Sequence, residues 1–228
     1  MHNTYLSIGA HIGDAELTTG LVLATKSLEG DKIITLALTA GERGNPKHMT
    51  VDDYRLQKIK EADDFAKMLQ GESIVLNYRD GELPDTLDVR LEVARMIRKY
   101  KPTLIFTHWK HSMHKDHQLT SKIVEDASFF AGIDMGDKLE GERHYAPVYF
   151  AENWEDSEAF TPYVYIAGSH EGYDLWKRAM QTHWFIMNSP SFRYYDYYTH
   201  LAVVRGCYAR KDYAQAFSVH EYQKKIIL

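Results

Sequence analysis

Histidines are concentrated in one short stretch of this chain. Of its twelve histidines, four lie within ten residues, at His108, His111, His114 and His117. Imidazole is the commonest neutral metal ligand and titrates near neutrality, so this cluster indicates a metal site or an acid–base site. The cluster directly follows the apolar run 103–107, which is typical of a buried strand. We therefore expect the site at the carboxyl end of a strand.

A second polar segment follows the first apolar run. Residues 5–10 read as a strand and are followed at once by His11, Asp14 and Glu16. In an open α/β sheet, ligands bind in the crevice beyond the carboxyl ends of the strands. The first and fourth strands of such a sheet can be neighbours, which would bring His11 and Asp14 next to His117. Two imidazoles and a carboxylate are a suitable donor set for a catalytic Zn²⁺ with a fourth position open.

The elements that must position these residues alternate in type over the first half of the chain. Apolar runs typical of strands lie at residues 5–10, 33–38, 73–76 and 103–107. Between them, apolar residues recur at helical spacing over 17–28, 56–69 and 87–97. This alternation predicts right-handed βαβ units and an α/β fold, with a mostly parallel sheet covered by helices on both faces.

The second half is less regular. It predicts a surface loop over 133–146, strands at 147–151 and 163–166, and helices near 172–185 and 197–207. The sequence shows neither a repeat nor a linker, so we expect a single domain over residues 1–228. In this domain the alternating half, residues 1–120, carries the metal site, and residues 121–228 complete the sheet, the pocket and an interface.

The composition is that of a globular protein and argues against several functional classes. Hydrophobic residues make up 44% and charged residues 26%, which is ordinary for a globular chain. The formal charge of −5 gives no electrostatic case for binding nucleic acid or an anionic membrane. The single Cys207 excludes an internal disulfide and fits a reducing compartment. Residues 1–17 lack a signal-peptide pattern. We expect a cytoplasmic protein that acts on a small molecule.

Two short motifs together resemble a known family. GAHIGDAEL at residues 9–17 and HKDH at residues 114–117 resemble the motifs of the PIG-L/LmbE-like N-acetylglucosaminyl deacetylases, which usually run AHPDDE and HPDH. That family consists of zinc hydrolases with a Rossmann-like fold, commonly hexameric. The resemblance covers roughly residues 4–120. It implies a Rossmann-like three-layer sandwich, a bound Zn²⁺ and a homo-oligomer.

The resemblance also implies roles for individual residues. His11, Asp14 and His117 fall on the three zinc ligands of the family. His114 falls on the histidine that stabilises the oxyanion and protonates the leaving amine. Asp116 falls on the carboxylate that orients this histidine.

Substrate contacts are less clearly marked. Asp80 follows the third strand, where relatives place an aspartate that touches sugar hydroxyls, but Asp-Gly is also an ordinary turn signal. Relatives often carry an arginine just after the second strand, and here the candidate is Arg43, three residues further on. The segment 150–156 is interpreted as a pocket wall or as an exposed loop. The aromatic segment 192–198 is interpreted as a sugar-stacking platform or as a subunit interface.

One departure from the family pattern affects the reaction itself. The family's general base is an aspartate two residues after the first histidine, and here that residue is Gly13, which cannot accept a proton. Another carboxylate can enter the crevice, the candidates being Glu16, Glu42 and Asp80. Alternatively His114 serves first as base and then as acid. In the third reading the chain has kept its metal and lost the reaction.

The sequence therefore predicts a zinc-dependent hydrolase that removes an N-acetyl group from a small amide, expected to be an N-acetylglucosamine-type amino sugar or its conjugate. Two alternatives stay open. One is a catalytically silent homologue that binds metal or sugar. The other is a metal-dependent esterase or amidase that acts on a non-sugar substrate. His108 and His111 match neither motif, and we expect them to line the loop rather than to bind metal.

Overall fold

The computed structural model describes residues 2–155 and 158–224. Within these residues the strands form one seven-stranded sheet in the order β3-β2-β1-β4-β5-β7-β6. The first five strands pair in parallel, whereas β6 and β7 join antiparallel beyond β5. The strands are β1 (Thr4–His11), β2 (Lys32–Thr39), β3 (Glu72–Tyr78), β4 (Leu104–His108), β5 (Val148–Ala151), β6 (Val164–Gly168) and β7 (Tyr213–Ser218). The predicted mostly parallel α/β sheet is confirmed.

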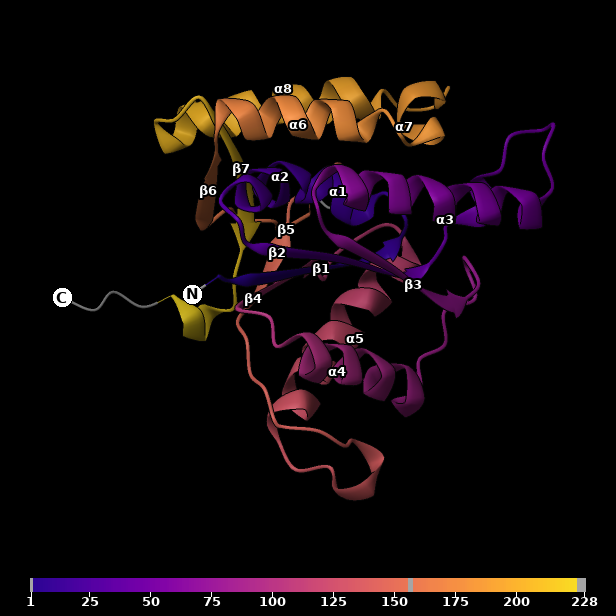
Figure 1. Ribbon diagram of the computed structural model, residues 1–228, viewed down its shortest axis with the longest axis vertical. Coiled ribbons are helices and arrows are strands. Elements are labelled where there is room, and N and C mark those ends of the chain that lie inside the picture. The colour runs from indigo at the N-terminus through magenta and orange to yellow at the C-terminus, as the bar shows by residue number, and fades with distance from the viewer. Residues whose placement is uncertain (1, 156–157, 225–228) are drawn as a thin grey trace.

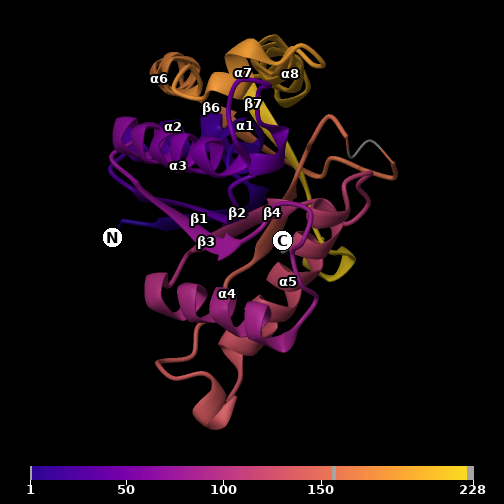
Figure 2. The same ribbon diagram turned by 90° about the vertical axis from the view of Figure 1, so that its right-hand side faces the viewer.

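Helices cover both faces of this sheet (Figures 1 and 2). One face carries α1 (Asp14–Thr18), α2 (Gly20–Leu28) and α3 (Val51–Met68). The opposite face carries α4 (Leu87–Tyr100) and α5 (Lys115–Gly132). Figure 1 shows that α6 (His170–Met180), α7 (Trp184–Asn188) and α8 (Tyr194–Ala209) lie above α1–α3 and roof that side of the molecule. Short 3-10 turns lie at Glu42–Gly44, Gly136–Lys138 and Glu221–Gln223.

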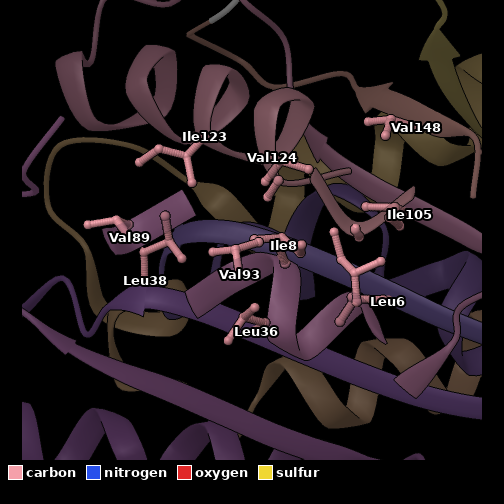
Figure 3. Packing of buried hydrophobic residues seen from close by; sticks show 14 of the residues in the cluster. Leu6, Ile8, Leu36, Leu38, Val89, Val93, Ile105, Ile123, Val124 and Val148 are labelled. Carbon is pink, nitrogen blue, oxygen red and sulfur yellow. The ribbon is translucent and has the colours of Figure 1, made fainter. Parts of the chain in front are cut away.

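The core explains why the parallel strands read as continuous apolar runs. Because helices cover both faces of β1, β2 and β4, side chains of both orientations on these strands are buried. Leu6 and Ile8 of β1 pack with Val93 of α4 and Val124 of α5 on one face (Figure 3). On the other face, Phe106 of β4 belongs to a second apolar cluster, which includes residues of α2, α6 and α8.

The differences from the sequence prediction are confined to particular elements. The stripe over 17–28 forms two helices, α1 and α2, and the stretch 172–185 contains most of α6 and the start of α7. Leu56, the first residue of the predicted helical stripe 56–69, is 68% exposed. The buried face of α3 runs through Tyr54, Lys58 and Ala62 instead. Helix α5 and strand β7 were not predicted from the sequence. No described helix is long and apolar enough to cross a membrane.

Candidate metal centre

The candidate site lies where the parallel strands end. β1 lies between β2 and β4, and the chain leaves β1 toward β2 but returns to its other side at β4. This change of direction creates the crevice in which α/β proteins bind ligands. His11 is the last residue of β1, and the loop after β4 leads to His114 at the start of α5. The two predicted motifs therefore meet at one point of the fold.

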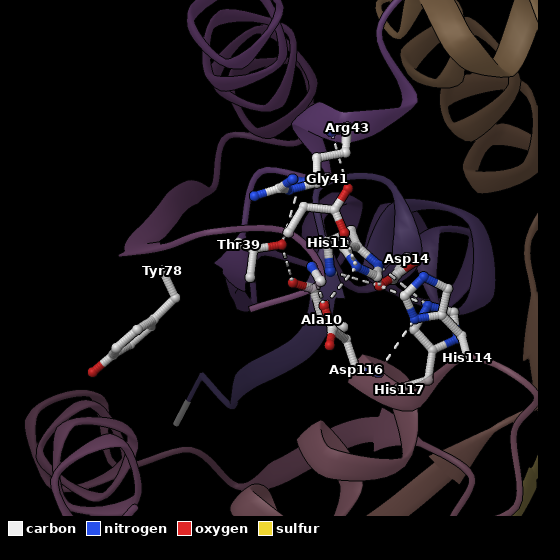
Figure 4. A network of polar contacts seen from close by, with 12 residues as sticks. Ala10, His11, Asp14, Thr39, Gly41, Arg43, Tyr78, His114, Asp116 and His117 are labelled. Atoms are coloured by element: carbon white, nitrogen blue, oxygen red, sulfur yellow. Dashed lines mark hydrogen bonds and ion pairs between the residues drawn. The ribbon is translucent and has the colours of Figure 1, made fainter. Parts of the chain in front are cut away.

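Three side chains converge on a common point. His11 Nδ1 lies 3.3 Å from Asp14 Oδ2 and 3.2 Å from His117 Nε2, and that Asp14 oxygen lies 3.5 Å from His117 Nε2. Figure 4 shows these side chains facing one another across the crevice. A zinc ion binds nitrogen and oxygen donors at about 2.0–2.2 Å, so three atoms at these separations can share one ion. The donor set thus fits the divalent metal that the motifs imply.

Carboxylates support both histidines from behind. His11 Nε2, on the far side of the ring, lies 3.2 Å from Asp80 Oδ1 and 3.5 Å from Asp116 Oδ2. The far nitrogen of His117, Nδ1, lies 3.5 Å from Glu155 Oε2. In metalloproteins, a carboxylate at the second ring nitrogen fixes the tautomer and orientation of a ligating histidine. This arrangement is what a metal centre requires.

His108 belongs to the centre, although the sequence analysis placed it in the loop lining. It is the last residue of β4, is buried, and stacks on His117 with ring centroids 4.0 Å apart. Its Nε2 lies 3.1 Å from Asp14 Oδ2 and accepts a 3.0 Å hydrogen bond from the backbone N–H of Ala10, so the ring is fixed at the edge of the centre. His111 is exposed.

The electrostatics of the cluster favour a bound positive charge. Burial lowers the pKa of His11, but the carboxylates of Asp14, Asp116 and Asp80 outweigh it and hold this pKa well above the ordinary value. Burial raises the pKa of Asp14, but His117, His108 and His11 hold it well below the usual range. The centre therefore keeps these carboxylates ionised, while burial and the charges of His108, His11 and His114 hold the pKa of His117 well below its ordinary value.

His114 lines the same pocket in a defined orientation. It is the N-cap of α5, and its Nδ1 accepts a hydrogen bond of 3.2 Å from the backbone N–H of Asp116. A nitrogen that accepts this bond carries no hydrogen, so the ring hydrogen is on Nε2. Burial and the charge of His11 lower the pKa of His114, which favours this neutral form. His114 can therefore donate a hydrogen bond from Nε2.

Asp116 lies elsewhere than the resemblance implied. Its carboxylate was expected to orient His114, but it contacts His11 and accepts a 2.7 Å hydrogen bond from the backbone of Gly81. The physical reason is the helix start, because at the first turn of α5 the His114 ring is held by the Asp116 backbone rather than by its side chain. Asp116 thus positions a proposed metal ligand.

The position of the family's general base is closed. Gly13 has φ +110°, a conformation that favours glycine. A Cβ at this residue would lie 2.3 Å from Cζ and 2.6 Å from Cε1 of Phe185, an aromatic residue of α7. An aromatic ring therefore fills the space that a side chain at residue 13 would need. Phe185 carries no sequence signal that would have indicated this role.

The three candidate substitute carboxylates do not take over that position. Glu16 is buried and accepts a 2.9 Å hydrogen bond from the backbone of Gly13, and burial raises its pKa to about 7. Glu42 is fully buried and pairs with Arg55. Asp80 does line the pocket, but it lies behind His11, on the side of the ring away from Asp14 and His117. We find no general base among these three.

The centre opens into a pocket of about 820 Å³. This is within the range of small-molecule sites, about 300–1,000 Å³. Its wall is rich in aromatic and amide side chains, among them Tyr54, Asn153, Trp154, Trp184, Phe185 and Tyr194. The segment after β5 thus forms a pocket wall, as one of its two interpretations held, although Asp156 lies outside the described residues. Arg43 lines the rim, where it pairs with Glu82.

Lys58 is a pocket residue that was not predicted, although the sequence contains a signal for it. Lys58 is 5% exposed and lines the pocket beside the aromatic wall. It lies four residues after Tyr54 and four before Ala62, which places it on the buried face of α3. A lysine within an apolar helical stripe is unusual, because lysine is almost never fully buried without a partner.

Comparison with known proteins yields a family and several relatives. The sequence profile of the GlcNAc-PI de-N-acetylase family, PIG-L, matches residues 6–128. The diacetylchitobiose deacetylase of Thermococcus kodakarensis is 28% identical over 133 residues, which are 56% of this chain and 50% of that protein. The chain thus spans about half the length of this curated relative.

Two solved structures extend the likeness over the whole chain. The conserved protein TT1542 of Thermus thermophilus is 25% identical with a TM-score of 0.82, covering 100% of this chain and 98% of that one. GalB, the 4-carboxy-2-hydroxymuconate hydratase of Pseudomonas putida KT2440, is 20% identical with a TM-score of 0.86, covering 99% of each chain. The latter likeness shows a shared fold.

Proposed function

Because the chain belongs to the GlcNAc-PI de-N-acetylase family, PIG-L, we propose that it is a zinc-dependent hydrolase that removes an acetyl group from the nitrogen of a small amide. An N-acetylated amino sugar or its conjugate is the substrate class that we propose. The deacetylase from Thermococcus kodakarensis supports this choice, since its name gives diacetylchitobiose as its substrate.

The single observation that carries the proposal is the convergence of His11, Asp14 and His117, each backed by a further polar side chain. These three residues would hold the zinc ion. When bound there, the ion supplies a Lewis acid that polarises the amide carbonyl and makes water a better nucleophile. Asp80 and Asp116 keep the His11 ring in its ligating orientation, and Glu155 does so for His117.

His114 is the residue that we propose to stabilise the transition state. As water adds to the carbonyl carbon it gives up one proton, and the amide nitrogen takes one up when the C–N bond breaks, so the proton count closes between water and amine. The Nε2–H of His114 can donate to the oxygen that gains negative charge in this step. Neutral imidazole at a helix N-terminus can polarise a carbonyl through its N–H group, because the helix N-terminus disfavours the protonated ring. The proposal therefore replaces the protonated His114 of the family pattern by the neutral Nε2–H tautomer. The aromatic side chains of the pocket wall support the apolar face of a sugar ring.

The experiment that tests this function combines metal analysis with an assay of released acetate on acetylated amino sugars. We expect the parent protein to bind one equivalent of zinc and to release acetate. The variant His11→Ala should lose both properties, while His111→Ala, an exposed histidine outside the centre, should keep both. Release of acetate by metal-free His11→Ala would refute the proposal. Zinc binding by a parent that hydrolyses none of the acetylated compounds would favour the silent homologue.

A second candidate function is water addition to an unsaturated carboxylate. The Phe185 ring at Gly13 excludes the proton acceptor on which the family's deacetylation depends, so another reaction of water in the same pocket is tested beside it. The fold is compatible with this chemistry, since it is shared with a hydratase. Loss of ultraviolet absorbance from a conjugated enol carboxylate, without acetate release from any amide, would support this candidate instead.

A further inference from the structure

Lys58 carries a buried charge that pairs with no carboxylate among the described residues. Its ammonium lies over aromatic rings, 4.6 Å from the centroid of Phe185 and 5.8 Å from that of Tyr54. Among the described residues, Nζ makes no hydrogen bond and has no carboxylate oxygen within 4.0 Å. An aromatic face stabilises a cation by only about 0.5–2 kcal/mol, much less than burial of the charge costs.

The carboxylates whose charges reach Lys58 are engaged elsewhere. Glu16 accepts from the backbone of the first motif, Glu61 accepts from Gln57 on its own helix, and Asp80 lies against the His11 ring. Burial lowers the pKa of Lys58, and the charges of Asp14, Glu16, Asp80 and Glu61 offset this effect only in part. The positive charge is therefore directed to the pocket and not to a protein carboxylate.

The amine also lies beside the metal centre. A Cβ on Gly41 would lie 2.9 Å from Lys58 Nζ and 2.9 Å from His11 Cβ, so the two side chains flank one small gap. Gly41 has φ +68° and lacks the side chain that would separate them. The Phe185 ring, which fills the space at Gly13, also lies against Nζ. A substrate whose amide lies at His11 must pass close to this cation.

A buried ammonium on a pocket wall needs a hydrogen-bond acceptor. An anionic group of the ligand can supply it and form a charge-assisted hydrogen bond. We propose that Lys58 binds a carboxylate or phosphate of the substrate, so that this site selects acidic amino-sugar derivatives over neutral ones. The inference rests on the proposed function for the identity of the amide. The anion-binding role of Lys58 does not depend on turnover.

The test measures binding to the zinc-loaded protein by titration calorimetry, with three amine products that differ in charge: glucosamine, glucosamine 6-phosphate and glucosaminic acid. We expect at least one anionic amine to bind about 10- to 100-fold more tightly than glucosamine, which is the worth of a hydrogen bond to a charged group. Preference for the phosphate or for the carboxylate identifies which anion the site takes. Lys58→Met should abolish this preference and Lys58→Arg should keep part of it.

Lys60→Met is the matched control, because Lys60 lies on the same helix, its side chain is 77% exposed and it pairs with Asp64. This variant should keep the preference of the parent. Lys58→Met should fold with an unchanged or higher melting temperature, because it replaces an unpaired buried amine by an apolar side chain of similar length. This measurement separates loss of binding from loss of structure.

Three results would overturn the inference. The first is a parent that binds no anionic amine more tightly than glucosamine. The second is a Lys58→Met variant that weakens all three ligands equally. The third is loss of acetate release in both Lys58→Met and Lys58→Arg with binding unchanged, which would make Lys58 a proton-transfer residue. Because binding is measured without turnover, a protein that deacetylates nothing refutes the proposed function while this test still decides the role of Lys58.

Discussion

The contact between Gly13 and Phe185 leads to a quantitative prediction for Gly13→Ala. The added Cβ would lie 2.3 Å from the Phe185 ring, so the ring must move. Overpacking of this kind costs about 1–3 kcal/mol. The backbone angle of +110° adds a further cost, about 1–2 kcal/mol for a residue with a side chain. We therefore expect Gly13→Ala to lower the free energy of unfolding by about 2–5 kcal/mol.

Urea denaturation of the parent, both single variants and the double variant measures this cost and its origin. In the Phe185→Ala background the ring is gone, so Gly13→Ala should cost only the backbone part, about 1–2 kcal/mol. An equal cost in both backgrounds, or a cost below about 0.5 kcal/mol in the parent, would show that the ring does not occupy this space. The same contact predicts that Gly13→Asp alone does not gain activity, because its carboxylate would need the space of the ring.

Three further predictions concern the centre and its surroundings. Asp80→Asn should weaken zinc binding about 10- to 100-fold in competition with a chelator, because His11 loses its carboxylate partner; unchanged affinity would contradict this role. If the protein releases acetate, His114→Ala should lower kcat about 100- to 1,000-fold with zinc content unchanged, whereas a change confined to KM would contradict transition-state stabilisation. Burial and the charge of Lys58 lower the pKa of His183 from 6.5 to about 3. As the pH falls from 6.5 to about 3, His183 is protonated in the unfolded chain but not in the folded protein, so the free energy of unfolding decreases by at most about 5 kcal/mol. His183→Met should reduce this decrease in denaturation experiments at neutral and acidic pH.

Local sequence patterns were sufficient for the three central parallel strands, although not for α5, which connects β4 to β5. The runs at 5–10, 33–38 and 103–107 became β1, β2 and β4 with each end shifted by one residue. Continuous apolar runs between helical stripes identify strands that are buried on both faces. β7 was missed because its pattern is different: Gln215 is buried there, with its side chain bound to the backbone of Val22 and Leu17. A polar residue that is satisfied by a distant helix leaves no local signal.

The candidate site also contains residues that could be predicted from the sequence and residues that could not. The positions of His11, Asp14, His117 and His114 followed from two motifs and the order of the strands. The contact of Asp116 with His11 did not follow, because it depends on how the first turn of α5 is capped.

Site residues that lie far from both motifs in the sequence could not be predicted either. Phe185 enters the site through α7, which α6 and the turn after it place over α1 (Figure 1). The packing of α6, α7 and α8 over α1–α3 brings the Phe185 ring to Gly13. Lys58 was the exception, since its spacing from Tyr54 and Ala62 already indicated a buried lysine.

Anomalous diffraction at the zinc edge from crystals of the zinc-loaded protein tests the central claim most directly. We expect a single strong peak in the crevice, bonded to His11 Nδ1, Asp14 Oδ2 and His117 Nε2 at about 2.0–2.2 Å. A peak bonded to other residues, or no peak at a saturating zinc concentration, would contradict the assignment of these three side chains as the metal ligands.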